Sequence, residues 1–210
     1  MRSDYSEASI IANCPHCDFS GWAYLSKVEE TPLFNVICDS HPLLEGHLLI
    51  IPKRHVVCVG DYTEAEFKEF ESLYGKYKAI LKKIYGPLAI FEHGKIGQTV
   101  FHSHVHFVPF NGKIEEVISE GCTKTISHLR ELFYFYQKEG QYLFIEIDRP
   151  YVVDTSIGVP RFFRDRLGNV LNASERANWK SMHQNTDLMN VALKENQTCI
   201  NKLKNEFSSF

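Results

Sequence analysis

The sequence predicts an α+β fold in which a mostly antiparallel sheet packs against one long helix. Short runs rich in branched aliphatic residues at 33–39 and 47–52 have the composition of strands. Two further strand-like runs follow at 88–92 and 99–109, and a helical pattern over 63–85 separates the two pairs. The order strand, strand, helix, strand, strand therefore favours mostly antiparallel strands.

The helix expected at 63–85 is marked at both ends. Thr63 and Glu66 have the spacing of a capping box at its start. Gly86 followed by Pro87 is a stop signal at its end. The apolar residues that recur at helical spacing between these ends are Phe67, Phe70, Leu73, Tyr74, Tyr77, Ile80, Leu81 and Ile84.

The bulk properties fit one large domain or a domain with a substantial extension, because the chain has 210 residues of which 44% are hydrophobic. A net charge of -3 gives no electrostatic case for strong DNA binding or for membrane binding. No apolar run approaches the roughly 20 residues that span a bilayer, and the N-terminus lacks the regions of a signal peptide. We therefore expect a cytoplasmic protein whose six cysteines form no disulfide framework.

The pattern changes after about residue 120, although no Gly/Ser-rich or Pro-rich linker marks the change. We expect residues 1–120 to form one domain and residues 121–210 to form an α/β extension that packs on it. The elements expected in the extension are a short helix near 126–136, a strand at 141–147 and helices at 160–171 and 186–207.

Three histidines, His102, His104 and His106, alternate along the last of the four strand-like runs. Alternate side chains of a strand share a face, so the three imidazoles would project from one side. The other side would present Phe101, Val105 and Phe107 to a core. A metal-binding strand or polar core histidines are alternative interpretations. Three imidazoles are costly to bury without partners, and imidazole is a good nucleophile near neutral pH, so the pattern favours a reactive site.

This segment resembles the motif of the histidine-triad (HIT) family, His-φ-His-φ-His-φ-φ, in which φ is apolar. The lead-in at 97–101, GQTVF, resembles the family's Gly-Gln-Ser-Val-Tyr. The stretch at 46–55, GHLLIIPKRH, is similar to the family's second signature. Cys14-Pro15-His16-Cys17 is similar to the Cys-x-x-Cys that opens many bacterial members. Four motifs in the family's order imply a HIT-like fold for the domain at 1–120.

The resemblance implies a nucleotide hydrolase or transferase that attacks an α-phosphate. His104 would be the nucleophile and form a nucleotidyl-histidine that water cleaves, with His102 and His106 completing the catalytic set. The nucleotide-binding residues would be Gln98 and Thr99 at the phosphate oxygens, Asp39 at the ribose hydroxyls, and Glu92. A carboxylate suits vicinal hydroxyls, although capping a turn is an alternative role for Asp39.

The sequence departs from the family pattern at two places. Ser103 occupies an apolar position, where we expect it to face away from the substrate. Residues 91–94, FEHG, stand where many members have an Asn-x-Gly that helps complete the phosphate site. Glu92 and His93 either line the site or have a structural role.

Cys14 and Cys17 are a weak signal alone, because the pair is also compatible with free thiols or a redox motif. The resemblance supplies two partners, His55 and His102, for a closed Cys₂His₂ zinc site. Such a site would be structural, since it leaves no open coordination position. We expect His16 to be a surface residue.

The stretch at 159–164, VPRFFR, with residues 175–179, ERANW, resembles the C-terminal region of CwfJ-like proteins, which also carry a HIT-like domain. Arg161 and Arg164 are three residues apart on an expected helix and could clamp a phosphate. A solvated or salt-bridged helix face is the alternative. We expect Phe162, Phe163 and Trp179 to be core residues rather than base-stacking platforms.

The expected substrate is an adenine nucleotide such as a dinucleoside polyphosphate or a nucleoside phosphoramidate. The resemblance implies no metal at the reacting phosphate, because histidines and backbone amides can stabilise its charge. The main rival is a non-catalytic nucleotide- or RNA-binding module of CwfJ type, and a metal-storage or metal-sensing protein is a third reading. Small members of the family are commonly homodimers, and the extension would either preserve or replace that interface.

Overall fold

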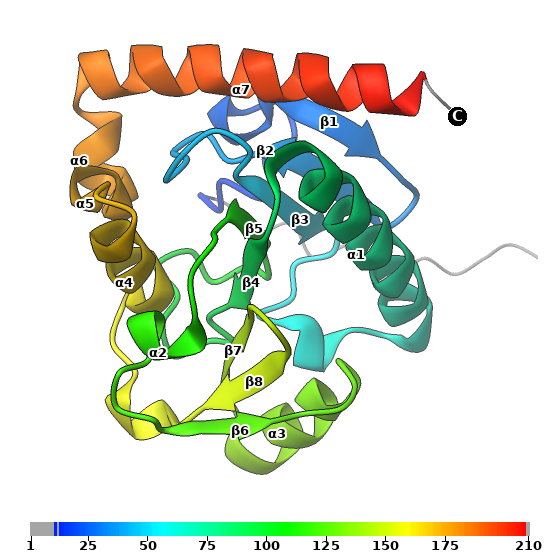
Figure 1. The fold of residues 1–210 in the computed structure, drawn as a ribbon. Coiled ribbons are helices and arrows are strands. Elements are labelled where there is room, and N and C mark those ends of the chain that lie inside the picture. Colours follow the sequence, from blue (N-terminus) through cyan, green and yellow to red (C-terminus); the bar gives the residue numbers. More distant parts are fainter. Residues whose placement is uncertain (1–10, 12, 209–210) are drawn as a thin grey trace, which may run out of the picture.

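The computed structural model describes residue 11 and residues 13–208. Its centre is one eight-stranded sheet in the order β1-β2-β3-β5-β4-β7-β8-β6 (Figure 1). Every neighbouring pair of strands is antiparallel. The strands are β1 (Lys27–Glu30), β2 (Phe34–Cys38), β3 (Leu48–Pro52), β4 (Leu88–Glu92), β5 (Val105–Pro109), β6 (Thr123–Thr125), β7 (Leu143–Glu146) and β8 (Pro150–Val153). The predicted α+β class with a mostly antiparallel sheet is confirmed.

Helices surround this sheet, and the longest in the first half is α1 (Glu64–Tyr85). Its expected capping box is present, because Thr63 Oγ1 accepts from the Glu66 amide at 3.3 Å and Glu66 Oε2 accepts from the Thr63 amide at 2.7 Å. The other helices are α2 (Ile114–Val117), α3 (Glu131–Glu139), α4 (Phe162–Val170), α5 (Ser174–Ala177), α6 (Trp179–His183) and α7 (Thr186–Phe207). Short 3₁₀ turns are η1 (Trp22–Tyr24), η2 (Val59–Asp61) and η3 (Thr155–Ile157). In the described part of the chain, no helix combines the length and the apolar character that a bilayer crossing needs.

The strand predicted at 99–109 is wrong in its first half. Only its second half, β5, is paired, with β3 and β4 from Val105 onward. Upstream of Val105 the backbone leaves the ladder, and the Ser103 amide donates to the Val56 carbonyl at 2.6 Å. Phe101, expected in the core, is 59% exposed, whereas Val105 and Phe107 are buried as expected. His102 and His104 therefore lie in the loop that precedes β5, called the histidine loop below, and His106 lies in β5 itself.

Side chains that alternate along the strands serve two cores, one on each face of the sheet. On β3, Leu48 and Ile50 pack with the apolar stripe of α1, which includes Phe67. Figure 1 shows α1 and α4 covering different parts of the sheet. Phe163 of α4 packs with Phe91 of β4 in the second cluster. Phe162 and Phe163 are fully buried core residues, as the sequence analysis predicted.

The C-terminal half continues the same sheet. Strand β7 pairs with β4, where Phe91 lies opposite Ile145, and β8 and β6 follow beyond it. The predicted division near residue 120 therefore falls within one continuous sheet. Helix α7, at the top of Figure 1, lies against β2 and α1. In this arrangement, helices α4 to α6 lie beside the histidine loop.

Candidate functional site

The histidine loop lines a pocket between the sheet, the N-terminal segment and the C-terminal helices. The pocket encloses about 50 Å³. His104, His106, His93, Thr99 and Asp39 line it from the first half of the chain. Arg161, Arg164 and Trp179 line it from the second half. Two of the three expected catalytic histidines thus share one cavity.

The His104 ring is held in one tautomer by the backbone. Its Nδ1 lies 2.6 Å from the carbonyl oxygen of His102, which can only accept, so Nδ1 carries the proton. Burial lowers the pKa of His104 below its ordinary value, against the opposing effect of this hydrogen bond. A neutral ring protonated on Nδ1 has a lone pair on Nε2. The half-buried His104 therefore presents a nucleophilic nitrogen at the pocket.

A chain of hydrogen bonds sets the tautomer of His106. His47 Nδ1 accepts from the Leu43 amide at 3.1 Å, and burial lowers the pKa of His47 to about 3, so this ring is neutral with its proton on Nε2. That proton points to His106 Nδ1 at 2.9 Å. The neutral His106 ring must then carry its own proton on Nε2. This buried Nε2 has no hydrogen-bond partner among the described residues, so it is a donor available to a ligand oxygen.

His102 turns away from this pocket into a cluster with Cys14, Cys17 and His55. Its Nε2 donates to the Pro52 carbonyl at 2.8 Å, which leaves Nδ1 facing the Sγ atoms of both cysteines at 3.5 Å. His55 Nδ1 lies 3.2 Å from Cys17 Sγ. The expected direct catalytic role of His102 is therefore corrected, since its ring faces the cluster and only its carbonyl oxygen contacts His104.

The four side chains of this cluster fit a zinc ion. Their potential ligand atoms all lie within 4.8 Å of one another. Two sulfurs and two imidazole nitrogens are a common donor set for tetrahedral structural zinc. The Pro52 carbonyl fixes the His102 tautomer that a metal ligand needs. All cysteines in the described residues are free thiols, as expected.

Asp39 lines the pocket just beyond the end of β2, and its carboxylate already has protein partners. Oδ2 accepts from Arg164 Nη1 at 2.8 Å, and Oδ1 accepts from the His41 amide at 2.9 Å. Burial opposes ionisation, but His47, whose Nε2 lies 3.4 Å from Oδ2, and the Arg164 guanidinium outweigh it and hold the pKa of Asp39 well below its ordinary value. A carboxylate has about four acceptor positions, so Asp39 retains capacity for a further donor.

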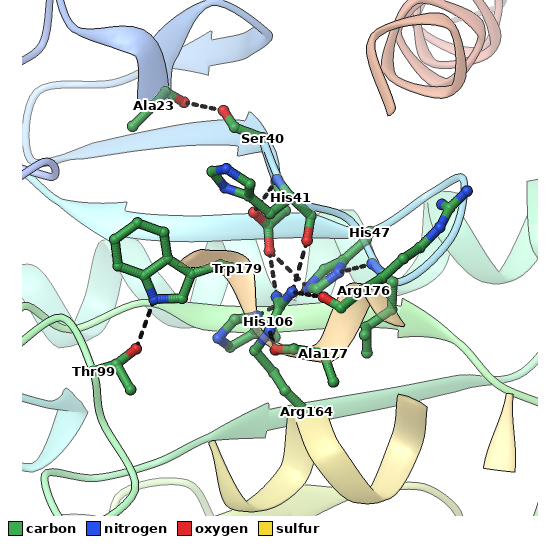
Figure 2. A network of polar contacts seen from close by, with 12 residues as sticks. Ala23, Ser40, His41, His47, Thr99, His106, Arg164, Arg176, Ala177 and Trp179 are labelled. Atoms are coloured by element: carbon green, nitrogen blue, oxygen red, sulfur yellow. Dashed lines mark hydrogen bonds and ion pairs between the residues drawn. The ribbon is translucent and has the colours of Figure 1, made fainter. Parts of the chain in front are cut away.

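Arg164 is an anchor within the fold. Its Nε donates to the Ala177 carbonyl at 3.0 Å, and Nη2 donates to the carbonyls of His41 at 2.7 Å and Arg176 at 3.0 Å (Figure 2). Together with Asp39, these acceptors use most of its donors. Arg161 does not share its helix face, because it precedes α4 with a left-handed φ of 63°. The expected pair of arginines on one helix face is therefore wrong.

The two polar residues before the histidines lie differently from each other. Thr99 lines the pocket, and its Oγ1 accepts from Trp179 Nε1 at 2.9 Å (Figure 2). Gln98 is buried behind it and donates from Nε2 to the Val57 carbonyl at 2.6 Å. Gln98 Oε1 has no hydrogen-bond partner within the described residues.

Glu92, expected at the nucleotide, is instead a buried structural carboxylate away from the pocket lining. It accepts from the Val59 amide at 3.1 Å, from Ser103 Oγ at 2.6 Å and from the Tyr142 hydroxyl. Burial raises the pKa of Glu92 to about 7. Ser103 does face away from the pocket, because it belongs to this buried network. His93 lines the pocket, with Nε2 accepting from the Phe163 amide at 3.1 Å.

The sequence did not predict that His16, Trp22 and Trp179 line the pocket or that His47 supports His106 beside it. His47 belongs to the motif at 46–55, but no role was predicted for it. A histidine at the start of an apolar strand-like run was the feature that could have indicated one. His16, expected at the surface, is buried in the pocket wall with its ring centroid 5.0 Å from that of His104. No feature of the sequence around Trp22 indicated that it would lie at the pocket. Trp179, expected in the core, is partly buried at the pocket.

Comparison with known proteins places this site in a family. A family model described as the HIT domain matches residues 23–112. A HIT-like protein of Mycoplasma genitalium is 34% identical over 111 residues, which cover 49% of this chain and 77% of that protein. The "Protein hit" of Bacillus subtilis is 30% identical over 106 residues, which cover 48% of this chain and 73% of that protein. A solved structure of a HIT family member from Bacillus subtilis is 30% identical, with a TM-score of 0.44 and coverage of 49% of this chain and 76% of that one.

Two relatives that match over a smaller share of their own length have names that state an activity. The bis(5'-nucleosyl)-tetraphosphatase of Schizosaccharomyces pombe is 32% identical over 38% of this chain and 46% of that protein. The bis(5'-adenosyl)-triphosphatase of Dictyostelium discoideum is 31% identical over 38% of this chain and 56% of that protein. The family match ends at residue 112, so the resemblance of the C-terminal half to CwfJ-like proteins stays a prediction. Domain match and relatives agree on one assignment: the chain belongs to the HIT family.

Proposed function

We propose that this protein is a nucleotide hydrolase or nucleotidyltransferase that forms a nucleotidyl-histidine on His104. The observation that carries the proposal is the orientation of the His104 ring. With Nδ1–H held by the His102 carbonyl, Nε2 is the unprotonated nitrogen, and the ring lines a pocket where a phosphate could approach it.

The reaction would proceed in two displacements at the α-phosphorus. In the first, His104 Nε2 forms a bond to phosphorus while the bridging bond breaks, and the leaving group takes that bond's electron pair. In the second, a water oxygen bonds to phosphorus as the Nε2–phosphorus bond breaks, and the water's proton passes to solvent. Hydrolysis then yields a nucleoside monophosphate, and an alcohol or phosphate acceptor in place of water would make the protein a transferase.

The surrounding residues support the same assignment. His106 would donate from Nε2–H to a phosphate oxygen, because His47 fixes its tautomer and no described residue takes that proton. Thr99 lines the pocket and would contact a phosphate oxygen. Gln98 could donate to a phosphate oxygen only from Nε2, which now donates to the Val57 carbonyl, so its side-chain amide would have to turn toward the pocket. Asp39 would accept from a ribose hydroxyl with its remaining positions.

The proposed substrate class is based on the names of two relatives. Two relatives are named as a bis(5'-nucleosyl)-tetraphosphatase and a bis(5'-adenosyl)-triphosphatase. We therefore propose dinucleoside polyphosphates as substrates, with nucleoside phosphoramidates as a second group and adenine as the base. Cys14, Cys17, His55 and His102 would hold a structural zinc that fixes the N-terminal segment beside the pocket.

The test is turnover by native protein and by His104→Ala, each incubated with diadenosine tetraphosphate and with adenosine phosphoramidate. We expect AMP release and a nucleotidyl adduct with native protein, and a loss of at least about 10³-fold in kcat/KM for the variant. The exposed His128 provides the matched control, since His128→Ala should keep native activity. Undiminished turnover in His104→Ala would exclude this mechanism.

A non-catalytic nucleotide-binding module is the second candidate. The observation that favours it lies at residues 91–94, FEHG, which stand where many family members have an Asn-x-Gly at the phosphate, and Glu92 does not line the pocket. Mass spectrometry separates the two candidates, because a binding module would retain AMP without forming an adduct. Proton-nitrogen correlation spectra give an independent check on the chemistry, since the nucleophile requires the Nδ1–H tautomer of His104.

A further inference from the structure

Both tryptophans of the chain lie at one end of the pocket. Trp22 belongs to η1 near the N-terminus, and Trp179 begins α6 in the C-terminal half. Their rings are stacked, with centroids 6.0 Å apart and planes inclined by 27°. The ring of His41 lies edge-on to Trp22 at 5.1 Å. Both indoles therefore line the same pocket as His104.

Trp179 is held in place by polar contacts on both sides. Its indole Nε1 donates to Thr99 Oγ1, within the loop that leads to His104. Two residues upstream, the Ala177 carbonyl accepts from the buried Arg164. The Asn178 side chain caps the start of α6 by accepting from the Lys180 amide at 3.2 Å. These contacts fix the indole at the pocket rather than in the core.

The two stacked indoles could admit one flat ring by moving apart. A ring held between two others makes a contact of about 3.5 Å on each face. The indole centroids are 6.0 Å apart and their planes are inclined by 27°, so the indoles would have to separate and become more nearly parallel, and one aromatic contact would be replaced by two. Trp22 is 38% exposed, so its side chain has solvent on one side into which it can move.

We propose that Trp22 and Trp179 bind the base of a nucleotide between them, so that the C-terminal segment completes the substrate pocket within the same chain. Trp179 lies outside the residues that match the HIT domain, 23–112, and it contributes a base-binding side chain that this match does not contain. The proposal rests on the proposed function for the identity of its ligand. Loss of one side chain that stacks on a base typically weakens binding by about 5-fold to 150-fold.

Tryptophan fluorescence reports directly on this pair, called the clamp below, because Trp22 and Trp179 are the only two tryptophans of the chain. The full-length His104→Ala protein binds ligand without turnover and is titrated with AMP and, separately, with ribose 5-phosphate, which lacks a base. We expect AMP to quench tryptophan emission and ribose 5-phosphate to leave it unchanged. Calorimetry then compares the indole variants in the same background. Trp179→Leu should weaken AMP binding about 10-fold with ribose 5-phosphate affinity unchanged, and Trp179→Phe should restore most of it.

Each other outcome overturns the clamp. AMP binding without a change in tryptophan emission, or native affinity in Trp179→Leu, would exclude base stacking. An equal loss of affinity for both ligands would show that Trp179 acts through Thr99. Failure of AMP to bind at millimolar concentration would also refute it. The clamp and the proposed reaction fail separately: quenching without an adduct in native protein refutes only the reaction, and an adduct without quenching refutes only the clamp.

Discussion

At the scale of single residues, the pair formed by Asp39 and Arg164 joins the two halves of the chain. The Arg164 side chain is 6% exposed and that of Asp39 is 10% exposed, so both charges are largely removed from water. Removing one member of such a pair leaves the other charge buried without compensation, which typically costs about 3–5 kcal/mol. The pair therefore couples the position of α4 to the end of β2.

We predict that Asp39→Asn lowers the free energy of unfolding by about 3 kcal/mol at pH 7. The folded-state pKa of Asp39 is depressed, so its contribution is present above the unfolded value of 3.8 and is lost as pH falls toward the folded value. The difference between native protein and variant should be constant from pH 7 to about pH 5 and shrink below pH 4.

Urea denaturation at a series of pH values measures this difference. The exposed Asp148 is the matched control, and Asp148→Asn should change stability by no more than about 0.5 kcal/mol. A difference for Asp39→Asn that persists unchanged at pH 3 would show that the charge of Asp39 does not stabilise the fold.

At the scale of elements, the N-terminal segment has few apolar contacts of its own. Ala23 and Tyr24 form a small cluster with Ile37 of β2 and with two residues of β3. The cluster of Cys14, Cys17, His55 and His102 is a further attachment of this segment to the sheet. A bound zinc would therefore hold His16 and Trp22 at the pocket.

We predict one zinc per chain and its loss in Cys17→Ser, because three remaining ligands do not close a structural site. The variant should lose about 3 kcal/mol of stability, which corresponds to roughly 10 °C in melting temperature for a chain of this size. Elemental analysis and thermal unfolding check both expectations. Cys122→Ser serves as the control, since Cys122 lies outside the cluster and should leave metal content and melting temperature unchanged. Equal zinc content in both variants would contradict the assignment.

At the scale of the whole molecule, the extension occupies a sheet edge that would otherwise be open. Strand β7 pairs with β4, so the edges of the described sheet are β1 and β6. Strand β1 carries Lys27, Glu29 and Glu30, and β6 carries an exposed Lys124. Charged side chains on edge strands disfavour pairing with another sheet.

We therefore predict a monomer, with a mass near 24.3 kDa by light scattering coupled to size exclusion. This replaces the homodimer that the family resemblance left open. The mass should not change over a 100-fold range of concentration. A mass twice as large would contradict the predicted monomer.

Much of the fold could be read from local patterns. Thr63 and Glu66 form the predicted capping box. The strand at 88–92 and the helix at 186–207 have the bounds that the sequence predicted. Local propensity and periodicity suffice there, because each pattern agrees with the final packing. The expected strand at 99–109 failed in its first half, since hydrogen bonding to Val56 and Trp179 overrides strand propensity there.

The sequence by itself determined the family and the fold class, and it singled out His104 and His106, which line the pocket, because short motifs encode them within a few positions of each other. Only the tertiary structure decided where Glu92 lies, which partner Asp39 has and which face of the pocket Trp179 lines. Asp39 and Arg164 are 125 positions apart, and Thr99 and Trp179 are 80 positions apart. The partners of Glu92 come from three separate segments, at Val59, Ser103 and Tyr142. The outcome of these contacts depends on the packing of the whole chain, which no local pattern records.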